Sequence, residues 1–391
     1  MPKLSPHFIY KLLILQAFIS IPAWGVPTNP SLSALTSAPE FTFGTTVIGV
    51  HFDGVENAPS SSTTLWSLAY TYPFSLKRLW DRRAGLSLSL TGPYGALRSL
   101  RAYEANDFYP LRYGHTDSQF QASVGWGLEI IPETFYFGSG VQFFLSGAGN
   151  SEATLSTVNP TGRLALEVGL NSALYSGVFF RRNRTSFSLA YYQEMNPEFI
   201  QRFDAKAPIG GENTFHQPLT AKSHLYFEPH HFKLEGKYDS GPFALNAGVS
   251  YQIWSRYQPP VVLAETIDSH GLVSSTTPPD TSLRDTWNPS IGLTVPLIDT
   301  LQFQASYVYR PTAVVDLSGV GNPLDATAHI VSLGIGQAVH EGTFLPFAFN
   351  WSLFGEQHFF ESRTVVKNAT SAIYTFSGSA YVYSARIIIP L

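Results

Sequence analysis

Cysteine is absent from the sequence, and charged residues are scarce. With no cysteine among 391 residues, disulfide bonds, thiol catalysis and cysteine-based zinc sites are excluded. Charged residues make up 13% of the chain, against ~25% in ordinary soluble domains. The net charge is −4 without a long basic run, which excludes a nucleic-acid-binding surface. Aromatic residues nevertheless reach 14%, and this composition favours an outer surface in contact with lipid.

The N-terminus has the pattern of a secretory signal peptide. A basic start, MPKLSPHFIYK, precedes the apolar run 12–21, and the small residues Ala23 and Gly25 occupy the −3 and −1 positions of a cleavage site. The alternative, a membrane anchor helix, needs about 20 apolar residues, and this run is shorter. We therefore assign residues 1–25 to a signal peptide and exclude them from the fold.

A strict two-residue alternation runs through the mature chain. In FQASVGWGLEI (120–130), Phe120 and Trp126 fall on one side of an extended chain, and Gln121 and Ser123 fall on the other. The same pattern recurs at 85–90, 185–192, 243–253 and 301–309. A soluble sandwich would carry charges on the polar face and aliphatic residues on the other. Small polar residues opposite rings are instead typical of a membrane barrel, with lipid outside and a lumen inside.

Short and long connections alternate along the chain. The short ones lie at 131–134, 181–184, 239–242, 298–300 and 340–343, and the long ones at 93–117, 195–222, 257–285 and 311–327. Membrane barrels have short periplasmic turns and longer extracellular loops. The sequence therefore predicts an all-β fold, a transmembrane antiparallel β-barrel of about 14 strands over residues 41–391. In this scheme 195–222 is loop, 223–238 is a strand, and both termini are periplasmic.

Five stretches carry the marks of one known family, in the family's order. They are NPSLSALTSAPEFTFGTTV (29–47), YQIWSRYQPP (251–260), RDTWNPSIGLTVPLIDTLQFQASYVYRPT (284–312), PLDATAHIVSLGIG (323–336) and TFSGSAYVYSARI (375–387). Together they resemble the FadL-type outer-membrane transporters of long-chain fatty acids and other hydrophobic compounds. The resemblance implies a fourteen-stranded barrel that passes hydrophobic ligands inward from the outer leaflet.

The resemblance also implies a hatch, an N-terminal segment folded into the lumen. Asn29 and Pro30 match the end of that segment. Only residues 26–28 would precede them after cleavage, so we expect residues 26–40 to be a short periplasmic or luminal segment, a reduced hatch. Two outcomes stay open at this point: a leakier lumen, or a lumen closed by loop residues.

The long connection PYGALRSLRAYEANDFYPLRYG (93–114) is the candidate for ligand binding. It combines apolar and aromatic side chains, which suit a hydrophobic tail, with arginines, which suit a carboxylate or lipopolysaccharide phosphates. The residues concerned are Leu97, Arg98, Leu100, Arg101, Tyr103, Phe108 and Arg112. The alternative is a loop that packs on the barrel rim with solvated arginines.

Two charged residues fall on faces predicted to line the lumen. Glu129 belongs to the strand expected over 118–130, and Arg386 to the closing strand YVYSARIIIPL. A charge at membrane depth is a candidate for the transport path. The alternative is that lumen charges stabilise the barrel.

The spacing of histidines, carboxylates and serines in the sequence supports neither metal binding nor catalysis. His230 and His231 are adjacent, so on a strand they point to opposite faces, and no group of histidines and carboxylates has zinc spacing. No G-x-S-x-G motif marks a nucleophilic serine. We expect no metal, no cofactor and no enzymatic activity.

These observations predict an outer-membrane channel for uptake of long-chain fatty acids or other hydrophobic compounds. The alternatives are a general diffusion porin and, less favoured, a barrel enzyme that modifies lipids. The expected location is the bacterial outer membrane, and the expected partners are its lipids, lipopolysaccharide and a hydrophobic small molecule. We expect a monomer without nucleic acid.

Overall fold

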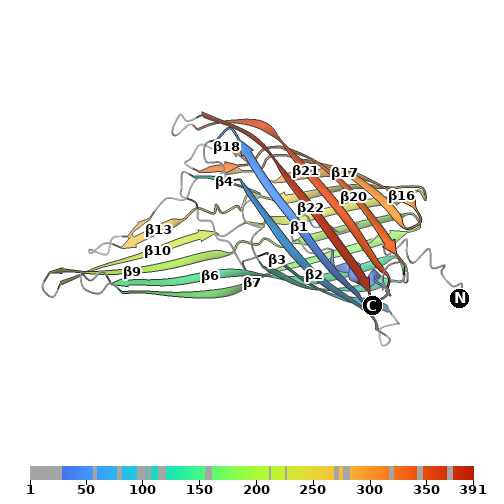
Figure 1. Ribbon diagram of the computed structural model, residues 1–391, viewed down its shortest axis with the longest axis horizontal. Coiled ribbons are helices and arrows are strands. Elements are labelled where there is room, and N and C mark those ends of the chain that lie inside the picture. Colours follow the sequence, from blue (N-terminus) through green and yellow to red (C-terminus); the bar gives the residue numbers. More distant parts are fainter. Residues whose placement is uncertain are drawn as a thin grey trace.

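The computed structural model forms a β-barrel with folded loops at one end (Figure 1). It describes residues 29–55, 60–76, 82–94, 103, 107–112, 120–154, 161–210, 213–224, 227–267, 273–275, 282–316, 321–340, 347–367 and 373–391. Over these ranges, no helix combines the length and the apolar character needed to cross a membrane. The predicted signal peptide, residues 1–25, lies outside the described residues.

Fourteen antiparallel strands form the wall of the barrel. They are β1 (Glu40–Asp53), β2 (Ser61–Leu76), β3 (Arg82–Pro93), β5 (Gln121–Ile131), β6 (Phe135–Thr154), β7 (Thr161–Arg182), β8 (Thr185–Tyr192), β11 (His230–Asp239), β12 (Ala244–Ile253), β16 (Thr286–Ile298), β17 (Leu301–Arg310), β20 (Ala328–Val339), β21 (Phe349–Val366) and β22 (Ile373–Pro390). Each pairs with the next in this order. β22 pairs with β1, from Glu40↔Pro390 to Asp53↔Ser377, and closes the ring. The predicted fold class is confirmed.

The barrel has two different ends, which we call the turn end and the loop end. At the turn end, tight links join neighbouring strands, as at 132–134 and 183–184. Glu133 and Asn183 in these links have φ angles of 55° and 53°, the left-handed conformation that tight hairpins require. β1 starts and β22 stops at this end. The long connections all lie at the loop end.

The alternation in the sequence decides which side chains face outward. Trp126 and Phe187 are 43% and 49% exposed, whereas Ser123 and Ser188, on the opposite face, are 8% and 6% exposed. Residues paired across neighbouring strands share a face, so outward rings gather in rows. Tyr251 and Trp287, for example, are paired in register with ring centroids 4.4 Å apart. The outer wall is therefore apolar and aromatic, as membrane barrels require.

The expectation of loop over 195–222 is wrong. β9 (Glu198–Gly210) and β10 (Asn213–His224) lie there, and β11 begins only at residue 230. β6 and β7 extend past the wall, and the free edge of β6 takes β9 as a parallel partner, which satisfies its backbone groups. β10 pairs with β9 and with β13 (Leu263–Ile267), which pairs with β14 (Val273–Ser275). These strands form an arm that projects to the left in Figure 1.

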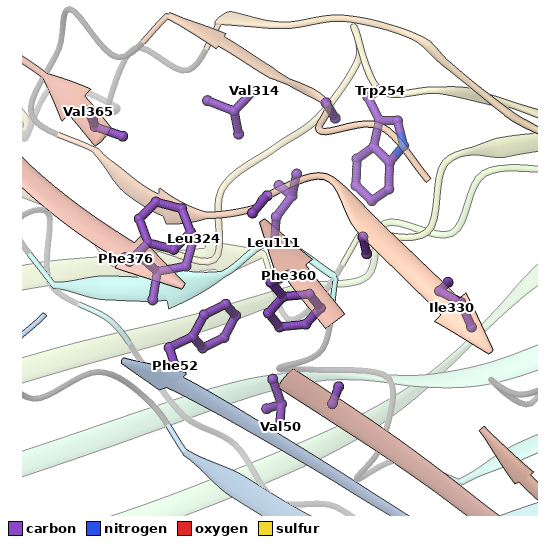
Figure 2. Packing of buried hydrophobic residues seen from close by; sticks show 14 of the residues in the cluster. Val50, Phe52, Leu111, Trp254, Val314, Leu324, Ile330, Phe360, Val365 and Phe376 are labelled. Atoms are coloured by element: carbon purple, nitrogen blue, oxygen red, sulfur yellow. The ribbon is translucent and has the colours of Figure 1, made fainter. Parts of the chain in front are cut away.

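The largest buried apolar cluster lies at the loop end, and we call it the loop-end cluster. Phe52 and Phe360, from β1 and β21, have ring centroids 5.5 Å apart, and Leu111, Trp254 and Leu324 join them from the loops (Figure 2). Two short strand pairs hold these loops: β4 (Phe108–Pro110) with β19 (Asn322–Leu324), and β15 (Ser282–Leu283) with β18 (Val314–Asp316). The loops thus fold onto the lumen side of the wall.

Candidate functional site

The predicted hatch remnant lies inside the barrel. Pro30–Leu35 form a 3-10 helix, η1, with Asn29 as its N-cap and proline at its first position. Asn29 is 6% exposed, and its side-chain oxygen accepts a hydrogen bond from the helix backbone at 3.1 Å. Its Nδ2 donates to Ser188 Oγ at 2.8 Å and to Val178 O at 3.1 Å. One amide therefore joins η1 to both β7 and β8.

A row of four glycines forms the wall against which η1 lies. Gly85 (β3), Gly127 (β5), Gly138 (β6) and Gly177 (β7) are paired in register, each with the next. A Cβ at these positions would come within 2.1, 2.7, 2.4 and 2.2 Å, respectively, of an atom of residues 29–33. Only glycine permits so close an approach of backbone to wall. We call this row the glycine seat.

Aromatic side chains bound the glycine seat on both sides. Toward the loop end, Tyr175 lies across Gly125 and Gly140, where an added Cβ would meet its hydroxyl or ring at 2.4 Å. Toward the turn end, Tyr136 and Phe179 form a buried cluster with η1, and their ring centroids are 6.1 Å apart. The helix is thus held in a slot and cannot slide along the wall without displacing a ring.

Glu129 lies on the turn-end side of this slot. It is 5% exposed, and its Oε1 accepts hydrogen bonds from Glu133 N at 2.6 Å and from the Tyr136 hydroxyl at 3.3 Å. Its Oε2 accepts a hydrogen bond from Arg83 N at 3.2 Å. Three donors around one carboxylate are the environment of a group that stabilises a hairpin turn.

The candidate binding loop is described only in part. Leu97, Arg98, Leu100 and Arg101 lie outside the described residues. Of the others, Tyr103 is 3% exposed and its ring centroid lies 5.8 Å from that of Tyr109. Phe108 packs against the loop-end cluster, with its ring 5.0 Å from that of Tyr374. The described part of the loop therefore covers the loop end of the lumen.

Arg112 is buried beneath this loop. Its Nε lies 3.2 Å from Asp325 Oδ1, and the two side chains are 5% and 2% exposed. It donates to Pro311 O at 3.1 Å, and its guanidinium lies 4.9 Å from the centre of the Trp254 ring. Burial lowers the pKa of Arg112, while the charges of Asp325 and Glu228 raise it again. Its charge is thus engaged within the protein.

Asp325 joins Arg112 to the loops and to the wall. Its Oδ2 accepts hydrogen bonds from Ala313 N at 2.7 Å and from the Thr312 hydroxyl at 3.1 Å. Arg363 of β21 donates to the backbone oxygen of Asp325 at 3.1 Å. The loop-end cluster is therefore fixed by one buried network, whose parts come from two separate long connections and the wall.

The lumen carries more charge than sequence analysis identified. On β11, Lys233, Glu235 and Lys237 alternate with outward Phe232 and Leu234, and Lys233 Nζ lies 2.8 Å from Glu235 Oε1. The signal was present in HHFKLEGKYD, where the charges recur every second residue. The strand predicted over 223–238 starts before β11, which begins at residue 230, so the alternation of charges was not recognised.

Arg386 and a second group of charges line the other side of the lumen. Arg386 on β22 is half-buried and pairs in register with Ser352 of β21. On β21, Glu356 Oε1 lies 2.5 Å from His358 Nε2, and its Oε2 accepts from Ser332 Oγ at 3.2 Å. The Glu356 carboxylate thus joins the hydroxyl of Ser332 to the imidazole of His358. Within the described residues, no group of three or more metal-binding side chains occurs.

Comparison with known proteins agrees with this architecture. A family model described as "TonB dependent receptor-like, beta-barrel" matches residues 23–361. No curated protein matches the sequence. Among solved structures, a Pseudomonas aeruginosa FadL homologue is 13% identical, with 93% of this chain and 92% of that chain covered and a TM-score of 0.58.

Two proteins named as transporter or channel of hydrocarbons also have folds similar to that of this chain. The toluene transporter TodX of P. putida is 12% identical, with 93% of each chain covered and a TM-score of 0.54. The monoaromatic hydrocarbon channel CymD is 13% identical, with 95% of this chain and 93% of that chain covered and a TM-score of 0.58. The predicted resemblance to FadL-type proteins is confirmed in the fold.

Proposed function

Since the chain belongs to the TonB dependent receptor-like β-barrel family, we propose that it is a bacterial outer-membrane channel for hydrophobic compounds. The observation that carries the proposal is a fold shared over more than nine-tenths of both chains with a FadL homologue and with two proteins named as hydrocarbon channels. In that location the turn end faces the periplasm and the loop end faces outward.

The substrate we favour is a long-chain fatty acid that enters at the 93–114 loop. The described residues of this loop contribute to buried apolar and aromatic clusters at the loop end, which suits a hydrophobic tail. Arg112 already faces Asp325, so the acidic head group falls to Arg98 and Arg101, the other two arginines of the loop. Lipopolysaccharide would meet the same loop from outside.

Two other functions compete with this proposal. A general diffusion porin needs an open aqueous lumen. Here η1 lies against the lumen side of the wall near the turn end, and the loop-end cluster lies on the lumen side at the loop end. A lipid-modifying enzyme needs a catalytic group, and the similar structures are named as channels or transporters. Swelling of proteoliposomes in sugar solutions would identify a porin, and phospholipid turnover in detergent would identify an enzyme.

The test is uptake of labelled long-chain fatty acid and of toluene by cells that lack other uptake channels. Cells that express the protein should take up one or both compounds faster than cells with empty vector. Arg98→Ala and Arg101→Ala should each reduce uptake of the acid about tenfold if the contact is desolvated, and toluene should be unaffected. Vector-level uptake of both compounds, at normal surface expression, would refute the proposal.

A further inference from the structure

Five arginines gather in one sector of the turn end, close to the glycine seat. They are Arg82 and Arg83 at the start of β3, Arg181 and Arg182 at the end of β7, and Arg184 in the turn that follows. β5 and β6 lie between β3 and β7 in the wall, so the five arginines fall within a sector of four consecutive strands, on β3, on β7 and in the turn after β7. Arg181 N donates to Thr134 O of the intervening turn at 2.7 Å. We call these residues the arginine cluster.

Few negative charges offset the arginine cluster. On the described parts of these four strands and their turns, the acids near this end are Glu129 and Glu133, and Glu129 is already engaged by three hydrogen-bond donors. One further acid, Asp239 of β11, lies beside Arg184, whose backbone oxygen accepts from Asp239 N at 2.8 Å. Arg83 Nη2 lies 3.8 Å from Glu133 Oε1, and these two side chains are 53% and 69% exposed. An ion pair so exposed contributes little. The sector therefore presents an excess of positive charge to any molecule at the turn end.

The alternation of the strands divides the arginine cluster between two sides of the wall. Arg83 and Arg181 share the face of the glycine seat and point toward the lumen, whereas Arg82 and Arg182 take the lipid-facing side. Contact with head groups of the surrounding membrane would account for the arginines on the lipid-facing side, Arg82 and Arg182. It would not account for the arginines that point toward the lumen. The lumen-facing pair lies on the turn-end side of η1, where a molecule that leaves the barrel through its turn end would pass.

We propose that the arginine cluster binds the anionic head group of an amphiphile at the turn end. The proposal rests on the function proposed above and deepens it, because it assigns the substrate an acidic head group and gives that group a second binding site, at the exit. Guanidinium groups bind carboxylate and phosphate through paired hydrogen bonds. Two sources offer such a head group: cargo that leaves the lumen would use Arg83 and Arg181, and a membrane phospholipid would use Arg82 and Arg182.

The absence of cysteine makes the site accessible to a single fluorescent label. Thr134→Cys places one thiol in the turn between the two halves of the cluster. The labelled full-length protein in detergent is titrated with a brominated long-chain fatty acid and with the matching brominated alcohol, each of which quenches the label on close approach. We expect the acid to quench at lower concentration than the alcohol, and salt to reduce the difference.

Variants then locate the head group. Arg83→Gln with Arg181→Gln should raise the apparent Kd of the acid about fourfold to twenty-fivefold, from two partly exposed contacts of about twofold to fivefold each, and leave the alcohol unchanged. Arg256→Gln, an exposed arginine at the loop end, is the matched control and should change neither. If instead Arg82→Gln with Arg182→Gln weakens binding, the acid binds on the lipid-facing side of the wall, the side from which a membrane phospholipid would approach. Mobility on unheated gels reports that each variant is folded.

Equal affinity of acid and alcohol for the wild type, or unchanged binding of the acid in both double variants, would overturn the proposal. Its failure is distinguishable from failure of the proposed function, which is read separately from uptake by cells. A protein that takes up hydrophobic compounds yet shows no preference for the acid at the turn end would keep its function and lose this site.

Discussion

Adding one methyl group to the glycine seat should open the channel to ions. In Gly85→Ala the new Cβ would lie 2.1 Å from Ser33 O, whereas ordinary contact begins at 3.4 Å, so η1 has to retreat by about 1.3 Å. That retreat breaks the hydrogen bond from Ser33 Oγ to Gly85 O, which is 3.0 Å long. Overpacking costs about 1–3 kcal/mol and the hydrogen bond about 1 kcal/mol. The seated state thus loses about 2–4 kcal/mol, a factor of roughly 30 to 700 in its population.

Single-channel conductance in planar bilayers measures this change. Wild type should show rare, brief openings, and Gly85→Ala and Gly127→Ala should show frequent or lasting ones. The control is Gly292→Ala on the lumen side of β16, where the nearest atom to the new Cβ is Ser306 Cβ at 3.2 Å and no atom of η1 is near. If the two seat variants conduct like wild type while their barrels remain folded, the glycine seat does not hold a stop in the lumen.

Three further outcomes follow from the contacts described. Arg112→Ala should destabilise the protein by about 3–5 kcal/mol in denaturant titration because Asp325 stays buried, and adding Asp325→Ala should recover part of this. Trp126→Arg should cost about 2–4 kcal/mol on the lipid face, whereas lumen-side Asn246→Arg should cost less than about 1 kcal/mol in refolding titrations. Burial raises the pKa of Glu228 from 4.5 to about 7. The folded state then binds the proton more tightly, so stability should fall as pH rises from about 4.5 to 7, and Glu228→Gln should remove that loss.

The wall of the barrel could be predicted from sequence because lipid and lumen impose opposite demands on alternate residues. Trp126 and Ser123 differ by three positions and fall on opposite faces, and a row of outward rings opposite small polar residues is typical of a membrane barrel. The arm could not be predicted in this way. β9 pairs in parallel with the free edge of β6 from a distant part of the chain, and a strand outside the membrane has no lipid face to mark it.

The site was predicted less completely, for a physical reason. Asn29 and Pro30 were identified through a resemblance, but the glycines that seat them look like ordinary small lumen residues in the sequence. Gly85 and Gly177 are far apart along the chain, and only the register of four strands brings them into one row. Register is set by the turns and by the alternation together, and the sequence alone defines neither to a single residue.

The glycine seat bears on the two outcomes that the sequence left open for the lumen, a leakier lumen and a lumen closed by loop residues. A short segment can obstruct a passage only if its backbone is held, because six residues bury little apolar surface of their own. Here the hold comes from close packing against bare backbone, from the Asn29 amide and from rings on either side. The loop-end cluster then adds a second obstruction, built from loops, at the other end. Hatch remnant and loops therefore lie at different levels of the barrel, and we expect a solute that passes through the lumen to displace each in turn.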